Sequence, residues 1–174
     1  AAGNAVVAKP SEVTPATAWL LSRLAVEAGL PPGVLNVVHG TGAGVGAELV
    51  AHPEVKAISF TGSTRVGAAI AAVAAPALKK LSLELGGKSP VVVMSDADLA
   101  LAIPGVAIAT FFLQGQNCMA GTRIFAHAAI HDALVDGVSA FAKAMALGHG
   151  LDPATQQGPM ISDVHATKVM RYIE

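Results

Sequence analysis

The chain has 174 residues, of which 53% are hydrophobic and 13% are charged, and its formal net charge is -1. Ordinary soluble domains contain roughly 25% charged residues, so we expect part of the apolar surface to be covered by something larger than this chain's own core. The balanced charge gives no basic surface for nucleic acid or for an anionic membrane. We therefore expect neither of these partners.

Cys118 is the only cysteine, which excludes an internal disulfide and favours a reducing compartment, the cytoplasm. The sequence begins without a methionine or a signal peptide and runs at once into an apolar strand. It closes inside a helical pattern. Both ends therefore predict a piece of a longer protein.

In its first half the chain alternates short apolar runs with helical patterns. The runs predict strands at residues 5–8, 34–38, 57–60 and 81–85. Between them we expect a helix capped by Thr14 with Pro15 at its first position, a short helix over 45–52, and an alanine-rich helix that ends at Ala75. This alternation predicts an α/β fold with a doubly wound, mainly parallel sheet, covered on both faces, as in a Rossmann-like cofactor domain.

The pattern changes after Gly86, where we place a domain boundary. The second part predicts strands at 91–94 and 124–126, and helices that begin at a cap on Asp96, cover 134–145 and start at Ser162. Residues 99–122 carry no charge over a length that could span a membrane, but Pro104 and polar residues interrupt them. A buried helix, kinked at Pro104 and followed by a functional loop, is the better interpretation. We expect a second α/β domain, incomplete like the first.

Two glycine-rich segments each follow a predicted strand and open a helix. Residues 40–47 contain one match to the dinucleotide-binding pattern GxGxxG/A, starting at Gly42, but no acidic residue follows about twenty positions later. A flexible turn is the alternative. Residues 62–67 have the glycine spacing of a phosphate-binding loop without its lysine. Their amides and the Ser63 hydroxyl could bind a pyrophosphate, or could simply begin the helix.

Charged and imidazole side chains mark two further places. Lys9 and Glu12 follow the first strand, at the edge where open parallel sheets bind ligands. Glu12 could accept hydrogen bonds from two ribose hydroxyls and Lys9 could donate one; two solvated surface charges are the alternative. His127 lies near the end of a predicted strand and His131 near the start of a helix, so their spacing of four does not predict a metal site.

The strongest chemical candidates are Cys118 and Glu84. A lone cysteine is more often a small buried hydrophobe, but Cys118 lies in a polar loop with Gln116, Asn117 and Gly121. Such a backbone-exposed loop after a long apolar helix is typical of a functional site. Glu84 ends a predicted strand and precedes two glycines, which fits a general base.

Four segments in this order resemble the aldehyde dehydrogenase superfamily: residues 6–12, 60–64, 83–90 and 115–118. Full members are much longer, so the resemblance implies a central piece. Residues 1–86 would be the C-terminal part of an NAD-binding domain, and residues 87–174 the N-terminal part of the catalytic domain. Three stretches are most similar to the muconic-semialdehyde dehydrogenase branch: residues 8–12, 52–55 and 79–84.

The resemblance implies oxidation of a small-molecule aldehyde to a carboxylic acid, with Cys118 as the nucleophile and Glu84 as the general base. Thiolate attack gives a thiohemiacetal, loss of hydride gives a thioester, and water activated by Glu84 hydrolyses it. The Cys118 amide would donate to the oxyanion. No metal is implied, and the parent enzyme is expected to be a homo-oligomer, either a dimer or a tetramer.

The resemblance also implies a cofactor site in the first half. Its expected residues are Lys9, Glu12, Gly42, Gly46, Gly62, Ser63, Thr64, Arg65, Val66 and Gly67. The adenosine ribose would meet the first two, the adenosine half Gly42 and Gly46, and the pyrophosphate the last six. We expect NAD in preference to NADP, because Glu12 would repel a 2′-phosphate and no arginine stands nearby in the sequence.

The chain departs from the family pattern at Leu113, where many members carry an asparagine. The asparagine that completes the family's oxyanion hole and the glutamate that holds the nicotinamide ribose lie outside the chain, so we expect the piece alone to be inactive. Two other functions stay open. Acyl transfer to coenzyme A is disfavoured by Glu84, because a hydrolytic base is unwanted there. A non-catalytic structural or binding role is disfavoured by the intact Cys118 and Glu84.

Overall fold

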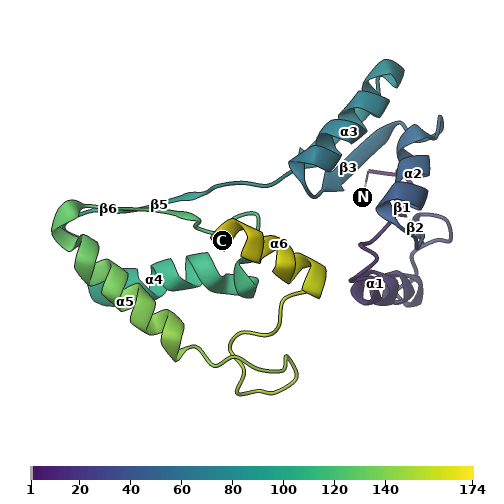
Figure 1. Cartoon of the computed structure of the whole chain (residues 1–174). Coiled ribbons are helices and arrows are strands. Elements are labelled where there is room, and N and C mark those ends of the chain that lie inside the picture. Colours follow the sequence, from purple (N-terminus) through teal and green to yellow (C-terminus); the bar gives the residue numbers. More distant parts are fainter. Residues whose placement is uncertain (1) are drawn as a thin grey trace. The chain divides into compact units, whose positions relative to one another are not determined.

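The computed structural model describes residues 2–174, which divide into two compact units (Figure 1). The first unit ends at Leu85, and the second unit is Gly86–Glu174. Both combine parallel strand pairs with helices, so the predicted α/β class with parallel strand pairing is confirmed.

The first unit contains two parallel strand pairs. Strand β1 (Val6–Ala8) pairs with β2 (Leu35–Val37), and β3 (Ala57–Thr61) pairs with β4 (Lys80–Glu84). Successive residues of a strand point to opposite faces, yet Val6 and Val7 are 49% and 47% exposed. The described residues therefore leave both faces of β1 partly uncovered, unlike the doubly covered sheet that the sequence predicts.

The helices of the first unit differ in how their first turns are capped. Helix α1 (Ala16–Glu27) has Pro15 at its N-cap with no side-chain hydrogen bond, so the predicted cap by Thr14 is wrong. A π-helical turn, Gly42–Gly46, precedes α2 (Ala47–Ala51), which lengthens the predicted helix at its start. Helix α3 (Thr64–Ala74) is capped by Ser63, whose Oγ accepts a hydrogen bond from the Val66 amide.

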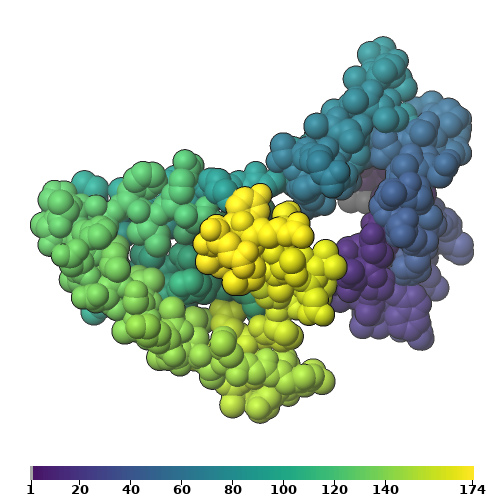
Figure 2. Space-filling model, viewed as in Figure 1, coloured from purple at the N-terminus to yellow at the C-terminus, as the bar shows by residue number. Residues whose placement is uncertain are grey.

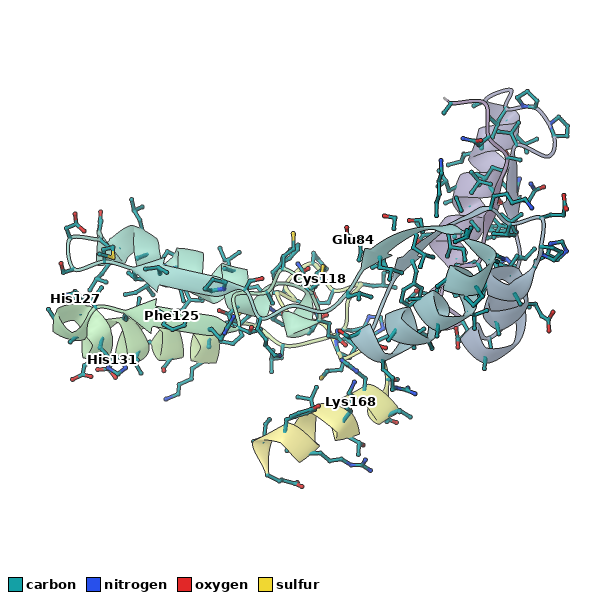
Figure 3. The ribbon with its side chains drawn as sticks, turned by 90° about the horizontal axis from the view of Figure 1, so that it is seen from above. Glu84, Cys118, Phe125, His127, His131 and Lys168 are labelled. Carbon is teal, nitrogen blue, oxygen red and sulfur yellow. The ribbon has the colours of Figure 1, made fainter. Side chains whose placement is uncertain are left out.

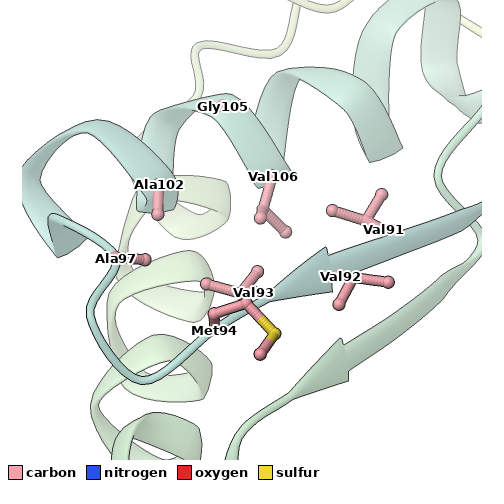
Figure 4. Close-up of a pocket in the computed structure, with 8 residues that line it drawn as sticks. All are labelled: Val91, Val92, Val93, Met94, Ala97, Ala102, Gly105 and Val106. Atoms are coloured by element: carbon pink, nitrogen blue, oxygen red, sulfur yellow. The ribbon is translucent and has the colours of Figure 1, made fainter.

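The second unit packs two helices against one strand pair. Strand β5 (Pro90–Val93) runs parallel to β6 (Arg123–Ala126), and α4 (Leu99–Phe111) lies against α5 (His131–Ala144). The core consists of Val93, Val106 and Leu134. An open apolar groove between β5 and α4 is lined by aliphatic residues and Gly105 and carries no charged side chain (Figure 4).

Two helix starts in the second unit test the predicted caps. Asp98, two residues later than predicted, caps α4, because its Oδ1 accepts a hydrogen bond from Ala100 N at 2.9 Å. Helix α4 runs on through Pro104 to Phe111. Ser162 caps the last helix, α6 (Asp163–Ile173), as the sequence predicts.

Much apolar surface stays exposed. Helix α6 has no buried residue, and its side chains stand on the visible surface of the second unit (Figure 2). Large hydrophobic side chains such as Leu101 at 74% and Phe112 at 56% are also open to solvent. Within residues 2–174, no helix combines the length and the apolarity needed to cross a bilayer.

Candidate active site

The loop that carries Cys118 starts at a tight corner after α4. Leu113, Gln114 and Gly115 all have positive φ angles of 52°, 57° and 68°. This left-handed backbone costs a non-glycine residue about 1–2 kcal/mol. Asparagine adopts this left-handed backbone more readily than leucine. Leucine at position 113, where the family pattern has an asparagine, therefore adds backbone strain. The corner must therefore be stabilised by contacts from elsewhere.

Asn117 shapes the turn around the thiol. Its Oδ1 accepts a hydrogen bond from Met119 N at 3.1 Å and lies 3.7 Å from Cys118 Sγ, and its carbonyl accepts from Ala120 N at 3.1 Å. Cys118 is exposed (Figure 3). Its amide donates to no acceptor among residues 2–174. The turn thus presents an open thiol beside a free backbone donor, the pair that a covalent catalyst with an oxyanion site requires.

Gly87 supports the same turn from the start of the second unit. A Cβ placed on Gly87 would lie 3.1 Å from the Cys118 carbonyl oxygen. That distance is shorter than an ordinary van der Waals contact, so glycine allows the chain to pass close to the cysteine. This contact explains at least one of the two glycines that follow Glu84.

A second segment of the same unit is bonded to the corner. Gln114 N donates to Gln157 Oε1 at 3.2 Å, and Gln157 Nε2 donates to the Phe111 carbonyl at 2.7 Å. Ile161 N donates to Gln116 Oε1 at 3.3 Å. Residues 157–161 therefore hold the loop on both sides of its left-handed corner.

Glu84 closes the last strand of the first unit. It lies opposite Thr61 in the parallel register, and its carbonyl accepts a hydrogen bond from Gly62 N at 3.0 Å. The residue is exposed. Its carboxylate is thus free in solvent at the carboxyl edge of the β3–β4 pair, where parallel sheets place their ligands.

Four of the predicted cofactor residues gather at the carboxyl ends of β1 and β2. Lys9 Nζ donates to the Gly40 carbonyl at 3.3 Å and pairs with Glu12 Oε2 at 3.5 Å. A Cβ on Gly46 would lie 3.7 Å from Lys9 Cδ and Cε, so the lysine stem packs along the π-helical turn. The Gly42 amide in that turn lowers the pKa of the Glu12 carboxyl.

The pKa of Glu12 is lowered from its ordinary value of 4.5. Its own backbone N–H contributes most by stabilising the carboxylate, and partial desolvation opposes this effect. The Gly42 N–H and the positive charge of Lys9 lower the pKa further. Glu12 is therefore ionised at neutral pH and can accept hydrogen bonds.

The predicted pyrophosphate segment forms the start of α3. Thr64, Arg65 and Val66 are exposed in the first turn of the helix, where amide groups lack partners within the helix. The Ser63 hydroxyl already accepts a hydrogen bond from Val66 N at 3.3 Å. Gly67 is buried, and its Cβ would meet Leu85 Cδ2 at 2.6 Å, so within this unit it serves packing.

The side chains of His127 and His131 each contact a neighbouring residue. His127 Nδ1 accepts a hydrogen bond from Ala129 N at 3.1 Å, and His131 Nδ1 lies 2.8 Å from Asp132 Oδ1 (Figure 3). The part of the chain from residue 2 to residue 174 contains no group of three or more side chains arranged to hold a metal ion.

The whole chain, residues 1–174, matches the aldehyde dehydrogenase family. The chain belongs to this family. It is 47% identical over 173 residues to a phenylacetaldehyde dehydrogenase of Pseudomonas fluorescens, covering 99% of this chain and 34% of that protein. It is also 47% identical over 174 residues to a 2-aminomuconic semialdehyde dehydrogenase of Bos taurus, covering 100% of this chain and 36% of the relative.

Solved structures agree with this family membership. An NAD-dependent aldehyde dehydrogenase from Sinorhizobium meliloti superimposes with a TM-score of 0.95 at 43% identity, covering 97% of this chain and 34% of that one. The family predicted from the sequence is confirmed, and muconic-semialdehyde enzymes are among its relatives. The chain spans about a third of the length of the relatives that it matches.

Two residues that contact the cysteine loop carry little or no signal in the sequence. Gly87 is marked only as one of two glycines after Glu84, and no pattern marks Gln157. Gln157 contacts the corner across 43 and 46 residues of chain. No local pattern signals such a contact, although a glutamine beside Gly158 and Pro159 in a polar turn is a weak hint.

Proposed function

We propose that this chain is the central part of an NAD-dependent aldehyde dehydrogenase that oxidises a small aldehyde to a carboxylic acid. The observation that carries the proposal is the family match over the whole chain, with an exposed thiol beside a free amide at Cys118. Residues 1–86 would belong to the NAD-binding domain and residues 87–174 to the catalytic domain. The parent enzyme would be a cytoplasmic homo-oligomer.

Cys118 would act as the nucleophile. Its thiolate forms a carbon–sulfur bond to the aldehyde carbon, and the carbonyl π electrons move to oxygen, giving a thiohemiacetal anion. The Cys118 amide donates to that oxygen. Bound NAD supplies the acceptor for the hydride whose loss leaves a thioester on the sulfur.

Glu84 would act in the second half of the reaction. Its carboxylate takes a proton from water, and the hydroxide that forms attacks the thioester carbon. The carbon–sulfur bond breaks, the carboxylic acid leaves, and the thiolate of Cys118 is regenerated. An exposed carboxylate at a strand end is accessible to the water that this step consumes.

The cluster around Glu12 fits the ribose of a dinucleotide. An ionised Glu12 offers two acceptor oxygens, and Lys9 adds a donor beside it. The exposed first turn of α3 offers amides to the pyrophosphate. We propose NAD over NADP, because the Glu12 carboxylate would repel a 2′-phosphate. Comparing kcat/KM for the two cofactors tests this choice, and a higher value with NADP would contradict it.

Two variants of the full-length protein test the two catalytic assignments separately. Cys118→Ala should abolish NADH formation with every aldehyde, because no covalent adduct forms. Glu84→Gln should keep a rapid burst of NADH equal to the enzyme concentration but slow the steady state, because the thioester persists. Wild-type turnover by either variant would refute the role of that residue. Transfer of the acyl group to coenzyme A by the wild-type protein would favour the acylating alternative.

A further inference from the structure

We propose that Gln157 is a positioning residue for Cys118. Its side-chain amide would hold the left-handed corner from which the cysteine loop departs, and so set the direction of the thiol and of the adjacent free amide. This inference rests on the proposed function only in taking Cys118 as the nucleophile. The geometry itself lies entirely within the second unit.

The burial of Gln157 is the first argument. Among residues 2–174 it is the only polar or charged residue that is buried, with 9% of its surface exposed. A buried polar group must find hydrogen-bond partners, because losing its water without replacement is costly. Among the described residues, the side-chain amide of Gln157 finds them in the cysteine loop and in the residue where α4 ends, so the burial of this amide is tied to that loop.

The chemistry of the two bonds is the second argument. Phe111 is the last residue of α4, and its carbonyl has no partner within the helix; Gln157 Nε2 donates to it at 2.7 Å. Gln157 Oε1 accepts from Gln114 N at 3.2 Å. One bond needs a donor and the other an acceptor, which a carboxamide provides at the two ends of one planar group.

The position of these partners is the third argument. They flank Leu113, and both Leu113 and Gln114 hold left-handed φ angles that their side chains disfavour. Without outside support this corner should relax toward ordinary backbone. Any such relaxation moves the residues that follow, and Cys118 comes four positions after Gln114.

Gln157 is itself firmly placed. Its amide donates to the Ala146 carbonyl at 3.0 Å, and its carbonyl accepts from Gly148 N at 3.1 Å. These bonds tie it to the residues that follow α5. The position of the corner therefore depends on the helical core of the second unit and not on the loop alone.

The neighbouring Gln156 provides a matched control. Its Oε1 accepts a hydrogen bond from Ala146 N at 2.9 Å, so it too bonds the backbone through its side chain. It is exposed and makes no hydrogen bond to the cysteine loop. Replacing either glutamine by methionine removes a carboxamide and keeps the length of the side chain.

The experiment compares Gln157→Met with Gln156→Met in the full-length protein. Amide hydrogen exchange of Gln114 and Gln116, whose N–H groups are bonded at the corner, should accelerate about tenfold or more in Gln157→Met, since the side-chain bonds that hold the corner are lost, and stay near wild type in Gln156→Met. The pH profile of Cys118 alkylation by iodoacetamide should shift only in Gln157→Met. In steady-state assays kcat should fall with little change in KM, because the reacting thiol is misplaced while aldehyde binding is kept.

A second variant guards against simple misfolding. Gln157→Glu keeps the acceptor for Gln114 N but, when ionised, loses the donor to the Phe111 carbonyl. Protonating the introduced carboxyl restores a donor, so loop exchange should return toward wild type as the pH falls, which Gln157→Met cannot do. Unchanged exchange and an unchanged alkylation profile in Gln157→Met would overturn the inference. Absence of aldehyde oxidation by the wild-type protein would instead refute the proposed function, and the exchange measurement would still decide the role of Gln157.

Discussion

The carboxyl of Glu12 shows how a few neighbouring groups lower the pKa of one residue. The lowered pKa arises mainly from its own N–H, and then from the Gly42 N–H and the Lys9 ammonium. Neither Lys9 nor Glu12 is unusual in sequence, where two solvated surface charges are the alternative to a ribose site. The π-helical turn supports the proposed ribose site, because it brings Gly42 and Gly46 to the same strand ends.

The lowered pKa predicts a specific dependence of stability on pH. A carboxyl whose pKa is lower in the folded state contributes stability above its unfolded pKa, and that contribution disappears as the pH falls through the folded value. Wild type should therefore have a higher free energy of unfolding than Glu12→Gln at neutral pH, and this difference should disappear as the pH drops below 4.5. Urea unfolding at several pH values measures this loss.

Glu27→Gln in the same unit controls for the removal of one negative charge. Glu27 pairs with Arg23 at 3.4 Å on the exposed side of α1, away from Lys9 in the chain. A direct check is the carboxyl carbon NMR titration of Glu12. A midpoint at or above 4.5 would contradict the electrostatic account of this cluster.

At the scale of elements, glycine sets the spacing between α4 and α5. A Cβ on Gly137 of α5 would lie 2.3 Å from Ile103 Cδ1 and 2.8 Å from Ile103 Cγ1. Non-bonded carbon atoms do not approach so closely, so a side chain there would force Ile103 or the helices to move. Since α4 ends at Phe111, where the cysteine loop begins, this packing also fixes the origin of that loop.

Gly137→Ala should therefore destabilise the protein by about 1–3 kcal/mol through overpacking, partly offset by up to about 1 kcal/mol of improved helix propensity. Gly105→Ala is the matched control. Gly105 lies inside α4 with nothing within 4 Å of its Cβ position, so this change should stabilise by about 0.5–1 kcal/mol. The two midpoints of urea unfolding should move in opposite directions. A Gly137→Ala midpoint above wild type would show that Ile103 or the helices can move at little cost.

The sequence predicts the elements far better than their ends and their long-range contacts. Apolar runs predict all six strands, because burial and side-chain alternation are local properties of the chain. The predicted helix cap at Asp96 is wrong. Asp98 has the same chemistry two residues later, and only the backbone geometry selects between the two aspartates. Cys118 and Glu84 stand out by their neighbours, whereas Gln157 acts through contacts 43 and 46 residues away.

The chain leaves exposed many large hydrophobic side chains that an independent domain would bury. Only a few hydrophobic side chains of the described residues are buried, the largest of them Leu134 at 2% exposure. Trp19, Phe112 and Tyr172 are 49%, 56% and 84% exposed. Exposed apolar surface on this scale is typical of surfaces that contact further protein. It agrees with a chain that spans about a third of its relatives' length.

We therefore predict that residues 1–174, expressed alone, neither oxidise aldehydes nor remain monomeric. The piece carries Cys118 and Glu84 but not the asparagine that the family resemblance places in the oxyanion hole, and losing one such donor costs about 10²–10³ in rate. The chain also lacks the glutamate that the family resemblance places on the nicotinamide ribose, and poor alignment of the nicotinamide should lower the rate further. Uncovered apolar faces should drive self-association. Light scattering during size-exclusion chromatography and NADH absorbance with an aldehyde panel measure both halves, with the full-length protein as the control. A soluble monomer that turns over at the full-length rate would show that residues 1–174 suffice for both folding and chemistry.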